Sequence, residues 1–148
     1  MTIHPPKHIL CAVRSRPGAE ETVQRAINLA LESGAKLTFC QIVDTDFVDR
    51  FSLRGSSRKA AYQEITEMAE FALMMIRDQA KREGVVDVDT VIRTGGVRRT
   101  LHQLVDELGI DMLVLGRPKK MAAQDVFNQK RLDAFVAGFE EKGVQVSR

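Results

Sequence analysis

The sequence has no long hydrophobic run and no strong excess of charge, and each absence excludes a class of protein. No stretch approaches the roughly 20 consecutive apolar residues that a membrane-spanning helix needs, so we expect no membrane association. Residues 1–7 include no apolar signal core, so we expect the protein to stay in the cytoplasm. The net charge is only +2, from 22 Lys and Arg against 20 Asp and Glu, and this balance does not indicate nucleic-acid binding.

Cysteine and histidine are also scarce, with two and three residues respectively, which leaves little material for disulfides or metal sites. Cys11 and Cys40 lie inside apolar segments. Two cysteines are enough for one disulfide, but we interpret both residues as buried thiols in a reducing compartment. His4, His8 and His102 are scattered and form no Cys/His cluster with metal-ligand spacing, so we expect no bound metal.

Short apolar segments alternate along the chain with segments of helical spacing, within a length of 148 residues that fits one domain, placed at 5–148. The expected strands span residues 8–13, 36–43, 86–92, 111–115 and 144–146. The expected helices span residues 20–33, 58–83, 97–108 and 128–142, each followed by a glycine. Residues 44–58 show no strong periodicity, so we expect an irregular surface segment there.

This alternation predicts the α/β class, with a single open five-stranded, mostly parallel sheet covered by helices on both faces. In such sheets, ligands bind beyond the carboxyl ends of the strands, at the point where the strand order reverses. The loops after the first, third and fourth expected strands contain eight basic residues and no acidic residue. The loop after the second strand has the opposite sign, with Asp44, Asp46 and Asp49.

The basic residues of the first and fourth loops are candidates for an anion site between those strands. They are Arg14, Arg16, Arg117, Lys119 and Lys120. Arginine presents a planar fork of donors that suits phosphate, and the helix N-termini after these loops add positive potential. The alternative is a solvated rim in which Arg14 or Arg16 pairs with Asp44 or Asp46.

Three segments of the chain together carry a family resemblance. They are the apolar strand at residues 9–13, Gly95-Gly96 before the third helix, and the segment 108–116, an apolar strand led by Asp111 and ended by Gly116. With these features, nearly the whole chain resembles the universal stress protein family. The resemblance implies a Rossmann-like sheet with strand order 3-2-1-4-5, of the adenine nucleotide alpha hydrolase-like type. It also implies a homodimer and a cytoplasmic role in stress response.

The chain departs from the nucleotide-binding members of that family at three places. Those members have an acidic residue just after the first strand, where Arg14 stands here. They also wrap phosphates with Gly-x-x-Gly, nine residues, then Gly-Ser or Gly-Thr. Gly116 matches the first glycine, but Lys119 occupies the second, and residues 122–128 contain no Gly-Ser or Gly-Thr. A side chain at Lys119 blocks close backbone approach and disfavours positive φ.

We therefore expect a regulatory or binding module without tight ATP binding or hydrolysis. Its homodimer is expected to form through the final strand, residues 144–146, as an open sheet edge. The alternative is a nucleotide-binding member that holds ATP or AMP with Arg14, Arg117 and Lys119.

In that alternative, the adenine lies near Ala12, Val13 and Ile42, and Leu115 and Gly116 complete the site. No cofactor is firmly expected, and a small anion is the other candidate ligand. An enzyme of a related nucleotide-handling fold is not expected, because no residue set offers a nucleophile with its base. Ser15, for example, lacks the sequence context of a nucleophile elbow.

Overall fold

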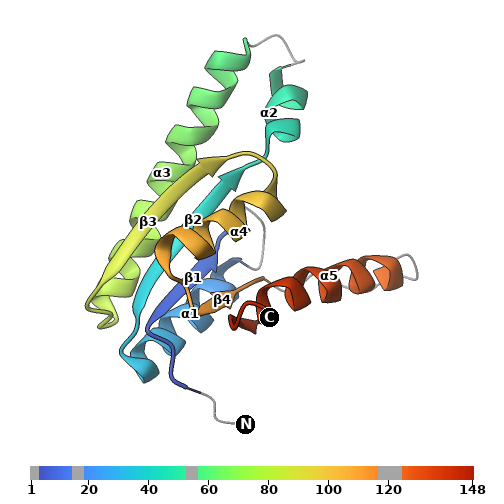
Figure 1. Ribbon diagram of the computed structural model, residues 1–148. Coiled ribbons are helices and arrows are strands. Elements are labelled where there is room, and N and C mark those ends of the chain that lie inside the picture. Colours follow the sequence, from blue (N-terminus) through green and yellow to red (C-terminus); the bar gives the residue numbers. More distant parts are fainter. Residues whose placement is uncertain (1–3, 15–18, 53–56, 117–124) are drawn as a thin grey trace.

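The computed structural model describes residues 4–14, 19–52, 57–116 and 125–148. These residues form one sheet with helices on both sides (Figure 1). The elements in chain order are β1 (His8–Ala12), α1 (Ala19–Ser33), β2 (Lys36–Val43), α2 (Thr45–Ser52), α3 (Arg58–Arg82), β3 (Val88–Thr94), α4 (Val97–Leu108), β4 (Met112–Val114), α5 (Asp125–Glu140) and β5 (Gln145–Ser147).

The sheet has five strands in the order β3-β2-β1-β4-β5, and every neighbouring pair is parallel. The predicted fold class and strand order are therefore confirmed. The central strand β1 pairs with β2 over its whole length and with β4 over residues 9–11. β5 is one edge of the sheet and β3 is the other.

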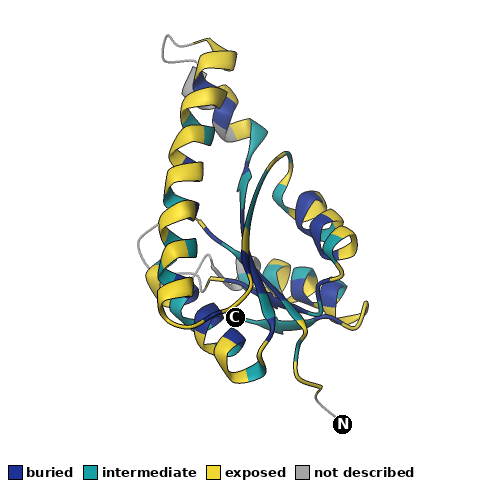
Figure 2. Cartoon of the chain, turned by 90° about the vertical axis from the view of Figure 1, so that its left-hand side faces the viewer, coloured by how far each residue is buried: buried dark blue, intermediate teal, exposed yellow. Residues whose placement is uncertain are grey.

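Two hydrophobic cores lie on opposite faces of the sheet. β1 contributes side chains to both cores, because successive side chains of a strand point to opposite faces. Ile9 and Cys11 belong to the core covered by α1 and α3, whereas Leu10 belongs to the core covered by α4 and α5. All three side chains are fully buried. Figure 2 shows this buried layer between helices whose outer sides are exposed. No helix in the described ranges is long and apolar enough to cross a membrane.

The two cysteines are both buried and both free. Cys11 packs in the α1/α3 core and Cys40 in the α4/α5 core, so the sheet separates their side chains. Burial raises the pKa of both thiols, that of Cys40 to about 12. The interpretation of two buried thiols therefore agrees with the structure.

The expectation of an irregular segment at 44–58 is wrong for residues 45–52, which form α2. The Asp44 carboxylate accepts the backbone N–H of Asp46 at 2.9 Å, in the manner of a helix N-cap, and Val48 is buried against Val43 and Ala61. The apolar residues Phe47, Val48 and Phe51 have helical spacing, but a segment of two turns is too short for that spacing to stand out among the polar residues around it. Ser57 caps α3 as its sequence position suggested, with Oγ accepting from Ala60 N at 3.1 Å.

Other element boundaries also differ from the sequence expectation, most notably those of β3, α5 and β5. β3 begins at Val88 and runs to Thr94 because it follows the long ladder of β2, in which Leu37 pairs with Val88 and Val43 with Thr94. Val86, expected to start this strand, is 96% exposed. α5 begins at Asp125 rather than at residue 128, and β5 is shifted by one residue, to 145–147.

Asp111 ties the amino ends of β1 and β4 together. Its carboxylate accepts the backbone N–H of Lys7 at 2.9 Å and that of His8 at 3.0 Å, although these residues lie about a hundred positions apart in the chain. The adjacent His8 ring contacts the Leu108 carbonyl at 3.1 Å and the Thr38 hydroxyl at 2.7 Å, and burial lowers its pKa. The aspartate that leads the fourth strand therefore has a structural role.

We predict that Asp111→Ala lowers the free energy of unfolding by about 1–3 kcal/mol, because backbone donors at the start of β1 lose a charged acceptor. Urea denaturation monitored by circular dichroism measures this change. Asp106→Ala is the matched control, since the Asp106 carboxylate only pairs with Lys142 on the surface. Its expected change is within about 0.5 kcal/mol. Equal effects of the two substitutions would contradict the role assigned to Asp111.

Candidate anion site at the carboxyl edge of the sheet

The candidate site lies where β1 and β4 end side by side. Because β1 is followed by β2 on one side and flanked by β4 on the other, the strand order reverses at this point. In open parallel sheets, ligands bind beyond the carboxyl ends of the strands at such a point, in a crevice between the diverging chains. Residues 12–14 lie at this point after β1, and residues 115–116 lie there after β4.

The apolar candidate residues fall on both faces of the sheet. Val13 and Leu115 are buried, each 8% exposed, and the Val13 N–H continues the ladder with Cys40 O at 2.8 Å. Ala12 and Ile42 are half-buried and pack against the α4/α5 core, whereas Val13 belongs to the α1/α3 core. The structure therefore brings Ala12 and Ile42 to one face and places the Val13 side chain on the other.

Arg14 is exposed directly after β1, at the end of the central strand. It forms no ion pair with any residue that the structure describes. The alternative pairing with Asp44 is not observed within the described ranges, and the Asp44 carboxylate instead caps α2. Arg16, Arg117, Lys119 and Lys120 lie outside the described residues.

Gly116 lies close to α1. A Cβ atom at this position would lie 3.2 Å from Thr22 Oγ1, and Thr22 itself is buried. Close packing of α1 against the end of β4 therefore favours glycine here, independently of any ligand.

Arg25 is a cation near this edge that the sequence analysis missed. From α1, its Nη2 donates to the Leu115 carbonyl at 2.6 Å, and Nη1 donates to Ser147 Oγ at 3.2 Å. The side chain is only 17% exposed, and Glu21 lies 3.6 Å from Nε. The sequence shows Arg25 only as a charged residue between the apolar positions Val23 and Ala26. That spacing does not distinguish a buried arginine from one at the exposed edge of a helix.

A further hollow of about 470 Å³ lies at the same edge of the sheet. It is lined by Thr45, Val48, Arg58, Lys59, Tyr62 and Thr94. The Thr94 hydroxyl donates to the Tyr62 oxygen at 2.8 Å, and Arg58 pairs with Asp49 at 3.0 Å. The sequence did not indicate this hollow because α2, one of its walls, was expected to be irregular.

The first turn of α4 carries Arg98 and Arg99 beside His102. Arg98 lies over the Phe135 ring at 5.7 Å, which gives this cation a partner despite the unfavourable helix dipole. The His102 ring stacks on Phe139 at 4.0 Å, and burial lowers its pKa. Within the described residues, no group of three or more His, Cys, Asp or Glu side chains is placed to hold a metal ion.

Comparison with known proteins now decides the family. The model of the universal stress protein family matches residues 5–128. The chain belongs to the universal stress protein family. A curated relative, named as a universal stress protein of Staphylococcus haemolyticus, is 27% identical over 111 residues, which cover 74% of this chain and 66% of the relative.

Solved universal stress protein structures share the fold at low identity. One from Burkholderia pseudomallei has a TM-score of 0.69 at 18% identity, covering 95% of this chain and 93% of that one. Another, described as a universal stress protein in complex with cAMP, has a TM-score of 0.61 at 19% identity, covering 97% and 96% of the two chains. At these identities, the likeness establishes the fold.

In this universal stress protein, Arg25 fixes the carboxyl end of β4 to β5. We predict that Arg25→Met, which keeps the apolar stem, lowers the free energy of unfolding by about 1.5–3 kcal/mol, because the Leu115 carbonyl loses a charged donor. Urea denaturation measures the loss. The control is Arg82→Met, at an exposed position on α3. A loss for Arg25→Met no larger than that for Arg82→Met would show that the contact contributes nothing.

Proposed function

We propose that this universal stress protein is a cytoplasmic regulatory module of the stress response that binds a small anion or a nucleotide weakly and does not hydrolyse ATP. The proposal rests on one observation above others. The side chain exposed at the end of the central strand, at the switch point, is the cation Arg14. A cation at this position favours an anionic ligand. Arg14 also stands in place of the acidic residue whose carboxylate would hold a ribose or a metal.

The sequence of the following loop argues for weak binding. Lys119 stands where the family's phosphate loop has its second glycine, and the later Gly-Ser or Gly-Thr is missing. Each hydrogen bond lost to a charged phosphate costs roughly 1.5–3 kcal/mol. Two such losses weaken affinity by about 100-fold or more. Basic side chains return part of this energy, but ordering them costs entropy.

The proposal excludes catalysis because the described groups at this edge of the sheet are cations and a carboxylate that is already engaged. Arg14 and Arg25 supply positive charge, whereas the Val13 and Leu115 side chains are buried in the two cores. Asp44, the carboxylate that follows β2, is engaged with the first turn of α2. Binding and charge stabilisation are therefore the chemistry that these groups support.

The second candidate function is nucleotide binding at the same edge. The structural neighbour in complex with cAMP favours it, since its fold matches nearly the whole of this chain. In this reading, ATP or AMP lies with its base near Ala12 and Ile42, and Arg14, Arg117 and Lys119 contact the phosphates. The two candidates differ in affinity and in dependence on the base, and both are measurable.

Calorimetric titration with ATP, ADP, AMP, cAMP and inorganic phosphate tests the proposal. We predict no submicromolar affinity for ATP, no phosphate release from ATP, and weak anion binding that decreases with salt, because exposed charges are screened. The binding is expected to disappear when Arg14→Ala is combined with Arg117→Ala.

The matched control combines Lys81→Ala with Arg82→Ala, which removes two exposed cations at the far end of α3. It is expected to leave the titration unchanged. Submicromolar ATP affinity, or nucleotide that copurifies with the protein, would instead support the nucleotide-binding candidate. Equal loss of binding in both double variants would show that net charge, and not the crevice, holds the anion.

We also propose that the protein is a homodimer joined through β5. This strand is an edge of the sheet. Gln145 N–H donates to Asp111 O, and Ser147 O accepts from Leu115 N–H, so residues 145 and 147 direct their backbone groups toward β4. The intervening Val146 therefore directs its N–H and C=O away from the sheet. Such open groups are available for pairing with a second copy.

Light scattering is predicted to report about twice the 16.6 kDa mass of the chain at moderate concentration. Val146→Pro is expected to weaken this dimer, because it removes an outward N–H without removing a hydrogen bond to β4. Val146→Thr, which keeps the donor, is the control and retains the dimer. A monomer in the unmodified protein at high micromolar concentration would contradict the proposal.

A further inference from the structure

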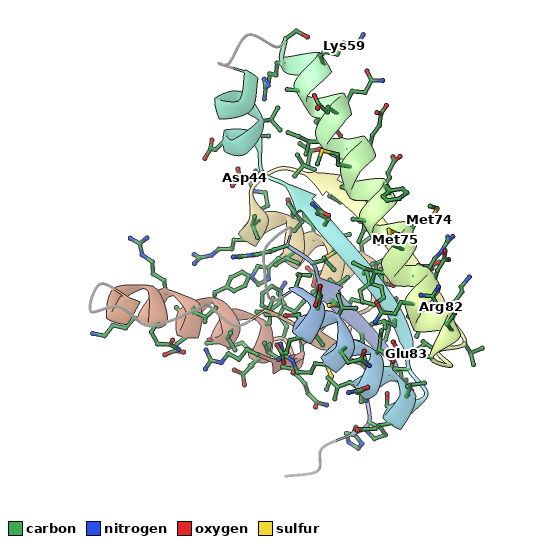
Figure 3. All side chains as sticks on the ribbon, turned by 180° about the vertical axis from the view of Figure 1, so that it is seen from behind. Asp44, Lys59, Met74, Met75, Arg82 and Glu83 are labelled. Atoms are coloured by element: carbon green, nitrogen blue, oxygen red, sulfur yellow. The ribbon has the colours of Figure 1, made fainter. Side chains whose placement is uncertain are left out.

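The outer side of α3 exposes large apolar side chains that nothing in the described structure covers. Met68 is 67% exposed, Phe71 61%, Met74 44% and Met75 57%. Figure 2 shows the exposed outer side of α3, and in Figure 3 no other element lies over the helix near the labelled Met74 and Met75. Single exposed apolar residues are ordinary, but a contiguous group of four on one helix indicates a contact surface.

The spacing of these residues is that of a helix pairing with another helix. The exposed positions Glu64, Met68, Phe71, Met75, Asp78 and Arg82 follow one another at alternating intervals of four and three residues. We call these six residues the α3 seam. This interval pattern places all six along one line of the helix, as in the contact line of a coiled coil. α3 has 25 residues, so the seam fits entirely within a continuous helix.

The ends of the seam carry opposite charges without partners. Glu64 and Arg82 are both exposed, and neither forms an ion pair with any described residue. The neighbouring Glu83 does not neutralise Arg82 by pairing with it. Its carboxylate accepts hydrogen bonds from Gln24 at 2.8 Å and Gln79 at 3.0 Å, which lower its pKa.

We propose that the α3 seam binds the α3 seam of a second copy of this chain, antiparallel and about a two-fold axis. The seam fits itself in this orientation. When Glu64 faces Arg82 of the other copy, Phe71 faces Met75 and Met68 faces Asp78. Every position of the seam then has a partner, and the two-fold axis makes each pair occur twice.

Charge selects this orientation over the parallel one. Between Tyr62 and Ile76 the charged residues of α3 are Glu64, Glu67 and Glu70, all acidic. After Ile76 the helix carries Arg77, Lys81 and Arg82 against Asp78. The helix also begins with the basic residues Arg58 and Lys59, which lie before the seam. Along the seam, antiparallel pairing places the acidic stretch 64–70 of one helix toward the basic end of the other, whereas parallel pairing places like charges together.

The pair of Asp78 with Met68 is the weak layer of the contact. A carboxylate opposite a thioether gains little and loses hydration. Because this layer also occurs twice, the α3 contact is expected to be weak and to form mainly at high concentration. It is separate from the edge strand β5, since α3 packs on β2 and β3 at the other side of the sheet. The two contacts can therefore operate in the same molecule.

Sedimentation equilibrium over a wide concentration range tests the proposal. The unmodified protein is expected to exceed the mass of its β5 dimer at high concentration, and Phe71→Glu to abolish that increase. Asp78→Leu is expected to tighten the contact by about tenfold, since an apolar pair replaces the weak layer. Thermal unfolding of both variants checks the fold, which an exposed position leaves intact.

A charge-swap cycle tests the orientation. Glu64→Lys and Arg82→Glu each place like charges opposite each other and are expected to weaken the contact. Their combination is expected to restore it, because the ion pairs reform with exchanged signs. Glu140→Lys, which makes the same charge change at an exposed position of α5 on the other face of the sheet, is the control.

The proposal is overturned if Phe71→Glu leaves the mass of the protein unchanged at every concentration, because no α3 contact then contributes to that mass. Val146→Pro removes the β5 dimer, and the α3 contact is expected to keep this variant dimeric. Adding Phe71→Glu to it is expected to give a monomer. If Val146→Pro changes nothing, the β5 proposal alone fails, and the response to Phe71→Glu still decides the α3 contact.

Discussion

Burial of both faces of β1 is the constraint on which the rest of the structure depends. Ile9, Leu10 and Cys11 are fully buried, with alternate side chains in two separate cores. A strand in this position must be paired on both edges and covered on both faces. The parallel neighbours β2 and β4, and the two helix layers, meet these requirements. The switch point follows from the same constraint, because β1 lies between β2 and β4, from which the strand order continues to opposite sides of the sheet.

Elements with a continuous buried surface could be predicted from the sequence. The apolar run at 9–13 and the helical spacing of 97–108 predicted β1 and α4 because their packing surfaces are continuous. The prediction was wrong at 45–52, because two turns of helix give too few apolar positions for their spacing to stand out. It also missed the start of β3, since the partner strand β2, rather than local composition, sets that boundary.

The candidate site was predictable in location and less so in detail. Strand topology placed Arg14 and Gly116 at the same edge, and the structure agrees. The side-chain direction of Val13 and the buried position of Arg25 depend on tertiary contacts that one sequence does not encode locally. Gly116 illustrates the difficulty, because its contact with Thr22 explains a glycine that a motif reading assigns to phosphate binding.

The short strand β4 is held by side chains at both ends, by Asp111 at the start and Arg25 at the finish. Both ends of this three-residue strand are therefore fixed by contacts with other elements. Strand length and positional stability are separated in this way. A strand too short to define its own register can occupy an inner position of the sheet when charged side chains at its two ends fix that register.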